Sequence, residues 1–467
     1  MAFVVALALV LAACGRDDET TPADDDGDTT TTAAPSDAPG AFGDLGELCG
    51  PAPDDATLAD TDTGVTAESI QISTFSDPGF AGRPGLNQEL FDTAEAFAAW
   101  CNDAGGINGR TIDLKLRDAA LVEYKNRVIE ACDEGDFMMV GGGAVFDDTG
   151  QEDRLACGLP TIAGYVVTAV ASEADLTYQP VPNPVEQLPV GDLRWIEEQF
   201  PESVDNVGIF TGSLETTVTV ARRYQEGIEQ LGWNVVYNEQ YNPAGEPTWR
   251  PMAEAMRAAG VEGLVYVGEP VNQAALLKAM ADIGYEPQWV RSDANHYDSL
   301  LITEGGAAVN NVFVRGVFHP FLDETLAAEN PATQQFLDIM GEYAPDGKIA
   351  NLGIQGFSSW LLFAAAAKEC GADLTRDCVW EELGGFTDWT GGGLHAPQDV
   401  GGKNAGECFV LYEGTPDGFV LPDIDATDGV YACSGDTKLE LTGDYGEGAT
   451  CPNPAYADDP KPSNCAA

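Results

Sequence analysis

The chain has 467 residues, which suits two or three domains, and 44% of them are hydrophobic, as in a folded globular protein. Acidic residues outnumber basic residues 77 to 22, which gives a formal net charge of −55. Nucleic acids and anionic membrane surfaces would repel such a chain, so we expect no nucleic-acid partner.

The N-terminus is typical of an exported lipoprotein. Residues 1–13 are apolar and uncharged, and small residues precede Cys14. The run is too short to cross a bilayer but fits the apolar part of a signal peptide, and Leu11-Ala12-Ala13-Cys14 resembles the bacterial lipobox. We therefore expect 1–14 to be a lipoprotein signal peptide, with Cys14 lipidated as the only attachment to the membrane. Because no Lys or Arg precedes the run, we expect translation to start upstream of Met1.

Residues 15–64 are rich in Asp, Thr, Ala, Pro and Gly. So few apolar side chains cannot offset the entropy lost on ordering, so we predict an acidic flexible tether. Cys49 is a candidate for fixing its far end to the folded body.

Strands and helices alternate after the tether. An alternating strand at 69–75 precedes a helix with an apolar face of Leu86, Leu90, Ala94, Phe97 and Cys101. The pattern then predicts strands at 111–116, 137–140 and 161–162, and helices at 123–134 and 149–157. This spacing is typical of right-handed βαβ units on a parallel sheet.

A second α/β series follows the Pro-rich segment 178–184. Its predicted helices are 190–200, 215–231, 249–259 and 271–283, and its predicted strands are 206–210, 234–241, 263–267 and 288–290. Residues 311–318 are expected to cross back, before helices at 331–343, 353–369 and 374–383. Short strands are expected from Cys408 onward.

The eleven cysteines fit an oxidising compartment. Without Cys14 they are ten, an even number, and no Cys-x-x-Cys spacing indicates a metal site. Three pairs are local in sequence: Cys370–Cys378, Cys408–Cys433 and Cys451–Cys465. The other four allow three pairings, of which we favour Cys132–Cys157 with Cys49–Cys101.

Several blocks resemble the periplasmic leucine/isoleucine/valine-binding family, the substrate-binding proteins of ABC importers. They are Val65–Ile72, the segment Asn102-Asp103-Ala104-Gly105-Gly106-Ile107-Asn108-Gly109-Arg110, Val140–Gly143 and Gly353–Phe357. The resemblance covers about residues 65–412. It implies the type I periplasmic-binding fold, with two doubly wound parallel-sheet lobes joined by three crossover segments. Lobe 1 would comprise 65–180 and 318–402, and lobe 2 would comprise 181–317 and 403–467.

The same resemblance implies an extracytoplasmic, cell-surface protein that is monomeric and needs no cofactor. Its partners would be a small solute, such as a branched-chain amino acid or related amide, and ABC permease subunits. A ligand-binding sensor or receptor subunit of the same fold is the alternative, although the chain shows no output module or transmembrane segment. No Gly-x-Ser-x-Gly or His-Glu-x-x-His motif occurs and there are only three histidines, so we expect no enzyme.

Ligands of open α/β sheets bind at the carboxyl ends of the strands. The loops after Phe75, Val140, Ile162, Phe210 and Val267, and the loop after Val290, should therefore face the cleft. The candidate ligand-binding residues in these loops and in the helix from 353 are Phe80, Gly142, Gly143, Ala144, Val145, Phe146, Ala163, Gly164, Tyr165, Gly212, Glu269, Asp293, Asn295 and Phe357.

The resemblance assigns two charged groups of an amino-acid ligand to these loops. The glycine loop at 141–143 and the loop at 163–165 would hold the carboxylate through backbone amides. A tight turn without a ligand is the alternative, and the acids Asp147 and Asp148 beside the first loop argue against an ordinary amino acid. Asp293 would pair with the ammonium group, with Glu269 as second candidate; a helix-capping or turn role is the alternative for each.

Overall fold

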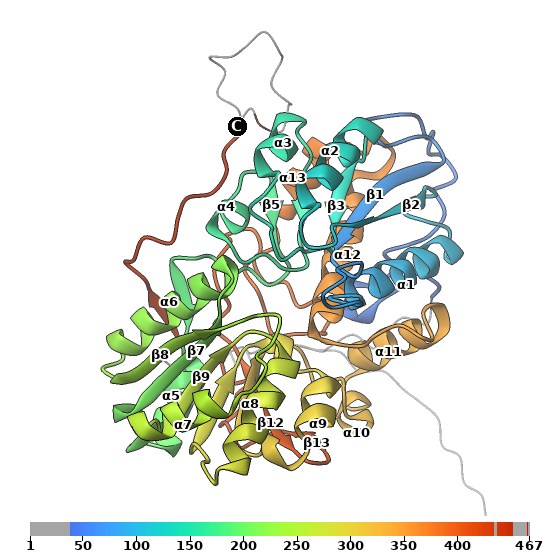
Figure 1. Ribbon diagram of the computed structural model, residues 1–467. Helices are drawn as coiled ribbons and strands as arrows, with labels where there is room; N and C mark the ends of the chain where they lie inside the picture. The colour runs from blue at the N-terminus through green and yellow to red at the C-terminus, as the bar shows by residue number, and fades with distance from the viewer. Residues whose placement is uncertain (1–37, 434–436, 452–464, 466–467) are drawn as a thin grey trace, which may run out of the picture. The chain divides into compact units, whose positions relative to one another are not determined.

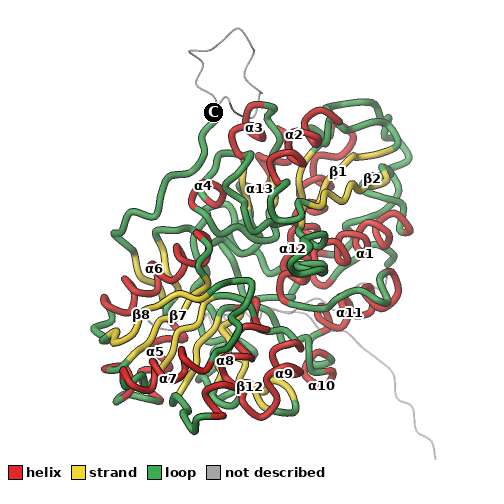
Figure 2. The backbone as a smooth tube through the Cα atoms, in the orientation of Figure 1, coloured by secondary structure: helices red, strands yellow, loops and turns green. Residues whose placement is uncertain are grey.

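The computed structural model describes residues 38–433, 437–451 and 465. The predicted signal peptide and the lipidation of Cys14 lie outside these residues. Two β-sheets with flanking helices account for most of the described chain, and Figure 1 and Figure 2 show their strands in separate groups joined by loops. Within the described ranges, no helix combines the length and apolar character needed to cross a membrane.

The first sheet is entirely parallel, with strand order β2-β1-β3-β4-β5. Its strands are β1 (Ser69–Ser76), β2 (Thr111–Asp118), β3 (Met138–Val140), β4 (Thr161–Ile162) and β5 (Thr177–Tyr178). Seven helices belong to this part: α1 (Glu89–Asp103), α2 (Tyr124–Glu134), α3 (Gln151–Ala156), α4 (Ala169–Ser172), α11 (Pro331–Tyr343), α12 (Asn351–Cys370) and α13 (Arg376–Leu383). Helix α12 is buried along most of its length against α1 and the sheet, which explains its nearly continuous apolar sequence.

The second sheet has strand order β13-β12-β11-β10-β9-β7-β8. Its strands are β7 (Val207–Gly212), β8 (Val235–Tyr241), β9 (Gly263–Val267), β10 (Trp289–Ser292), β11 (Val312–Gly316), β12 (Val410–Thr415) and β13 (Gly418–Val420). The helices of this part are α5 (Gly191–Gln199), α6 (Glu215–Gln230), α7 (Arg250–Ala259), α8 (Pro270–Asp282), α9 (Ser299–Gly305) and α10 (Glu324–Ala327). Every residue of β7 and β9 is buried, as expected for central parallel strands covered on both faces.

Short elements complete the fold. Strands β6 (Gln187–Pro189) and β14 (Lys438–Glu440) form a separate antiparallel pair. The 3₁₀ turns are η1 (Gly43–Leu45), η2 (Ser203–Asp205), η3 (Ala294–His296), η4 (Gly306–Val309) and η5 (Gly371–Asp373). The sequence pattern did not predict α4, α9, α10, β5 or β6, each of which is two to seven residues long.

Two predictions about the second part needed correction. Residues 311–318, predicted as a crossing, first form β11 inside the second sheet, and the crossing begins only after Gly316. The sheet is also not wholly parallel, because β12 pairs with β11 in antiparallel register and β13 pairs with β12 in the same way. Both differences follow from the late return of residues 410–420 to the edge of a sheet built mainly from residues 207–316.

Segments that connect the two sheets contact one another. Residues 317–319 pair with 394–396 through the amides of His319 and Ala396, with N–O distances of 2.9 Å in each case. Gln187 accepts a hydrogen bond from the amide of Ala405 at 2.9 Å. The three passages of the chain between the sheets therefore lie together, as a hinge requires.

The tether prediction is wrong for residues 38–64. Phe42 is fully buried against Trp100 and Phe357, and Gln335 on α11 hydrogen-bonds both Ala41 and Gly43. A few apolar side chains are enough here because they insert into a core formed by α1, α11 and α12, rather than forming one of their own. The polar composition of residues 38–64 therefore does not reveal that this segment is packed against the folded body.

The C-terminal residues also depart from the expected layout. They were expected in lobe 2 with the rest of 403–467, but the amide of Asp175, beyond α4, donates to the carbonyl of Ala449 at 2.9 Å. The amide of Cys451 donates in turn to the Asp175 carboxylate at 2.7 Å. Residues 449–451 therefore pack on the first part of the molecule.

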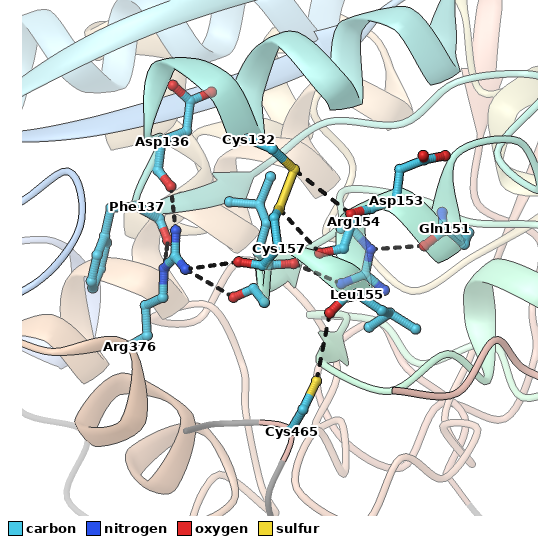
Figure 3. The surroundings of a disulfide bond; sticks show 12 residues. Cys132, Asp136, Phe137, Gln151, Asp153, Arg154, Leu155, Cys157, Arg376 and Cys465 are labelled. Atoms are coloured by element: carbon cyan, nitrogen blue, oxygen red, sulfur yellow. Dashed lines mark hydrogen bonds between the residues drawn. A yellow bond between two sulfur atoms is a disulfide. The ribbon is translucent and has the colours of Figure 1, made fainter. Parts of the chain in front are cut away.

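The described residues form five disulfides, and these join the pairs favoured from the sequence: Cys49–Cys101, Cys132–Cys157, Cys370–Cys378, Cys408–Cys433 and Cys451–Cys465. Figure 3 shows Cys132–Cys157, which connects α2 to the end of α3. Beside it, Arg376 of α13 donates to the carbonyls of Asp136 and Phe137 at 2.6 and 2.8 Å. This arginine therefore connects α13 to backbone carbonyls at the start of β3.

Candidate functional site

One large cavity, of about 680 Å³, lies between loops that belong to the two sheets. In each sheet the strand order reverses beside the first strand of the series, β1 or β7, so the loops that follow neighbouring strands diverge. Loops after β1, β3 and β4 line the cavity from one side, and loops after β7, β9 and β10 line it from the other. The volume falls within the range of about 300–1,000 Å³ that is usual for small-molecule sites.

The structure places half of the expected ligand-binding residues on the cavity wall. Those that line it are Phe80, Val145, Tyr165, Gly212, Glu269, Asp293 and Asn295. Those that do not are Gly142, Gly143, Ala144, Phe146, Ala163, Gly164 and Phe357. The residues on the wall come from both sheets, so the strand-end argument locates the cavity correctly.

The residues off the wall have structural surroundings of their own. A side chain at Gly142 would meet the backbone of Phe75, and one at Gly143 would meet the ring of Tyr165. These glycines therefore allow the loop to approach neighbouring parts of its own chain closely. Phe357 is fully buried in the aromatic core beside Phe42.

The amides expected to hold a ligand carboxylate are already bonded to the protein. The amide of Val145 donates to the carboxylate of Asp77 at 2.8 Å, and the amide of Gly164 donates to the carbonyl of Gly142 at 2.7 Å. Burial raises the pKa of Asp77, while the amides of Val145 and Leu121 oppose that effect. The Asp77 carboxylate thus accepts from the amide of Val145, one of the candidate ligand-binding residues.

Asp147, one of the two acids that argued against an amino-acid site, has a similar internal role. Its carboxylate accepts hydrogen bonds from the amide of Val167 at 2.7 Å and from the hydroxyl of Thr168 at 2.6 Å. Burial raises the pKa of Asp147 to about 7, although these donors favour the ionised form. The side chain connects the loop after β3 to the loop after β4.

Asp293 is paired within the protein. Its carboxylate accepts from the guanidinium of Arg291 at 2.5 Å and from the hydroxyl of Tyr224 at 2.6 Å. Burial alone would raise the pKa of Asp293, but the charge of Arg291 and these two bonds hold it below its ordinary value. Arg291 also bonds the buried Asp192 at 2.7 Å and lies over the ring of Tyr224.

Glu269 forms an ion pair with Arg83, and both side chains line the cavity. Glu269 precedes α8 in the second part, whereas Arg83 lies in the loop after β1 in the first part. Burial lowers the pKa of Arg83, and nearby acids partly offset this. Each side chain is about one-third exposed, at 31% and 34%, so solvent weakens the attraction.

Sequence reasoning missed the arginines of the wall, Arg83, Arg223 and Arg315. Arg223 lies on the buried face of α6, and Arg315 lies on β11, where the sequence predicted a crossing. A charged residue within an otherwise apolar strand is the signal that could have identified Arg315. In the part of the chain that the structure describes, no group of three His, Cys, Asp or Glu side chains could hold a metal ion.

Solved structures with the same fold include solute-binding proteins of transporters. A fatty acid ABC transporter substrate-binding protein from Thermomonospora curvata aligns with a TM-score of 0.63 and 15% identity, over 82% of this chain and 99% of that chain. A leucine-binding protein from Thermotoga maritima aligns with a TM-score of 0.60 and 15% identity, over 75% and 97%. A branched-chain amino acid transporter substrate-binding protein from Streptococcus pneumoniae, in complex with isoleucine, aligns with a TM-score of 0.58 and 14% identity, over 76% and 100%.

Comparison of sequences alone gives the family. No curated protein matches the chain significantly. The profile of the family described as periplasmic binding protein matches residues 85–417, which include both sheets except β1 and β13 and all the loops that line the cavity from the second part. With the type I fold and the cavity between its two sheets, this match shows that the chain belongs to the periplasmic binding protein family.

Proposed function

We propose that this protein is the solute-binding component of an ABC importer and that it binds a small organic solute in the cavity between the two sheets. One observation carries the proposal: loops from the carboxyl ends of strands in both sheets line one cavity of about 680 Å³. A solute held by both sets of loops would favour their approach, and closure about the crossing segments would mark the loaded form for a permease.

The class of solute includes branched-chain amino acids and related molecules with an apolar body. Most of the wall is apolar, with polar groups at a few positions, as in sites that orient one ligand. Two of the solved proteins with this fold are described as substrate-binding proteins of a fatty acid transporter and of a branched-chain amino acid transporter, and these solutes share an apolar body and a carboxylate. The cavity therefore suits an apolar solute with one polar end.

A thermal-shift screen tests the binding function directly. A ligand that binds only the folded protein raises its melting temperature, by an amount that grows with concentration above Kd. We expect at least one apolar amino acid or organic acid to do so, and calorimetry should then give a 1:1 complex. Unchanged melting temperature across amino acids, organic acids and their amides would contradict the proposal.

Lipidation is the second part of the proposal and has its own test. Cys14 follows an apolar run and small residues, so the mature protein should carry lipid on this cysteine and lie at the outer face of the cytoplasmic membrane. Metabolic labelling with a fatty acid should mark the wild-type protein and fail to mark Cys14→Ser. Equal labelling of both proteins would refute the anchor without affecting the binding function.

A further inference from the structure

Charged side chains from both parts of the molecule meet beside the cavity. The first part supplies Arg83 in the loop after β1, Glu89 at the start of α1, and Lys348 between α11 and α12. The second part supplies Glu269, which precedes α8, and Asp298, which precedes α9. Both cations of this cluster therefore come from the first part, and two carboxylates that pair with them come from the second part.

Lys348 contacts both parts through its ammonium group. Its Nζ lies 3.1 Å from Oε2 of Glu89, within the first part, and 3.0 Å from Oδ2 of Asp298, in the second part. The amide of Lys348 donates to the carboxylate of Asp92 on α1 at 2.8 Å, so the backbone here is held to the first part. The contact with Asp298 is therefore made across the boundary between the two parts.

The two carboxylate oxygens of Asp298 have different partners. Oδ1 accepts from the amide of Leu300 at 2.9 Å and so caps α9, whereas Oδ2 pairs with Lys348. The side chain of Asp298 is only 4% exposed, so its charge has lost most of its contact with water. A carboxylate in such a position needs a nearby cation, and Lys348 supplies one.

The ion pair of Arg83 with Glu269 is a second contact of the same kind, with its cation in the first part and its acid in the second. Burial lowers the pKa of Arg83, and the charges of Glu89 and Asp298 oppose this effect, so the two contacts belong to one cluster. Lys348 and Asp298 do not line the cavity, although Arg83 and Glu269 do. The contact between Lys348 and Asp298 therefore bears on the approach of the two parts and not on a solute directly.

The overall charge of the protein acts against this approach. Acidic residues outnumber basic residues in both parts, in keeping with the net charge of −55, and two acidic bodies repel each other. If this repulsion dominated, removing an acid at the boundary would bring the two parts together. If the ion pairs dominate, removing the same acid drives them apart, so the direction of the change separates the two cases.

We propose that the ion pairs Lys348–Asp298 and Arg83–Glu269 form a latch that holds the two parts of the molecule closed over the cavity. This inference deepens the proposed function, on which the role of closure rests, but its test needs no solute. Lys348 and Asp298 favour the closed form, and so act on solute binding, without touching the solute.

The distance between spin labels on the two parts reports how far the protein is open. Nitroxide labels are attached at Val122→Cys in the loop after β2 and at Val420→Cys on β13, which are exposed positions. Cys14→Ser prevents a third label, because the other ten cysteines are held in the five disulfides. Double electron–electron resonance then gives the distribution of distances in the solute-free protein.

Asp298→Asn is the main test of the latch. Asn caps a helix as well as Asp does, so the bond to Leu300 is kept while the charge that faces Lys348 is lost. We expect the ratio of closed to open forms to fall about fivefold, the upper end for a partly exposed ion pair. Adding Glu269→Gln should lower it about twenty-five-fold in total, because both contacts act on one equilibrium.

Glu89→Gln is the matched control. It removes the same charge from the same lysine, but within the first part, so it should leave the distances as they are in the wild type. Circular dichroism and urea melts verify that each variant is folded. Glu269→Gln alone changes a partly exposed side chain, so it tests the second contact even if Asp298→Asn does not fold.

The outcomes distinguish the latch from the function on which it rests. A shift toward the closed form in Asp298→Asn, unchanged distances in the folded double variant, or equal opening in Glu89→Gln would each overturn the latch. Solute binding in the thermal-shift screen, by a protein whose label distances ignore these substitutions, would leave the proposed function supported without the latch. Opening of the variants with no solute found in that screen would support the latch and count against the proposed function.

Discussion

His395 should make the stability of the hinge region depend on pH. It lies where residues 394–396 pair with the crossing segment 317–319, and it is 2% exposed. Its Nδ1–H donates to the carbonyl of Ala396 at 2.8 Å, so its Nε2 must accept from the hydroxyl of Ser358 at 2.9 Å. The indole of Trp389 donates to the same hydroxyl at 3.0 Å. This network therefore favours the neutral imidazole, because protonation of Nε2 would remove the acceptor of the Ser358 hydroxyl.

The magnitude follows from the pKa. Burial lowers the pKa of His395 from 6.5 to about 4. Between these pH values the unfolded chain binds a proton at His395 that the folded protein does not bind. The contribution of the neutral His395 to the free energy of unfolding is therefore fully present above pH 6.5 and is lost as the pH falls toward 4. The full loss is about 3 kcal/mol, and about 2.5 kcal/mol of it should have occurred by pH 4.5.

Urea melts at pH 7.5 and pH 4.5, on wild type and on His395→Gln, measure this contribution. His296 also titrates in this window, since burial lowers its pKa to about 4, and carboxylates contribute as well. These groups are common to both proteins, so the difference between the two pH dependences isolates His395. We expect the wild type to lose about 2.5 kcal/mol more than the variant. Parallel pH dependences would refute the assignment of a buried neutral imidazole.

Two further predictions concern stability. Replacing Cys49 and Cys101 by Ser should lower the free energy of unfolding by about 4 kcal/mol, because that disulfide spans 52 residues. Replacing Cys370 and Cys378 by Ser should lower it by about 2.5 kcal/mol, because the span is only 8 residues. Urea melts that give the reverse order would contradict the loop-closure argument. Asp293→Asn should lower the free energy of unfolding by about 3 kcal/mol, because it removes one of the two carboxylates that pair with the buried Arg291. Glu269→Gln should lower it by less than about 1 kcal/mol, because the ion pair of Glu269 is partly exposed to solvent. Equal losses for Asp293→Asn and Glu269→Gln would show that Asp293 is not required to balance Arg291.

The fold could be predicted from sequence where elements are long and regular. The alternation at 69–76 and the apolar face of α1 identify these elements, because a period of two or 3.6 residues is a local property of the chain. The packed segment around Phe42 could not be predicted this way. Its burial depends on a core contributed by residues more than 50 positions away, which local composition does not report.

The location of the site was more accessible to sequence reasoning than its chemistry. Strand ends indicated the loops that hold Tyr165, Gly212 and Glu269, because parallel strands place their following loops at one edge. The partner of each charged group could not be predicted from the sequence. Asp293 was expected to pair with a ligand cation, but it accepts hydrogen bonds from Tyr224, 69 residues away in the sequence, and from Arg291. Pairings of this kind are decided by tertiary packing.

The C-terminal segment restricts how the protein can move. Tyr445 is bonded to Glu226 on α6 in the second part, and Ala449 is bonded to Val170 on α4 in the first part. Only four residue steps separate these attachments, a reach of about 14 Å at full extension. While both attachments remain, the two parts stay close together at this edge, and the opposite edge must move furthest when a solute enters. Shortening or lengthening 446–448 would therefore set the angle through which the protein opens.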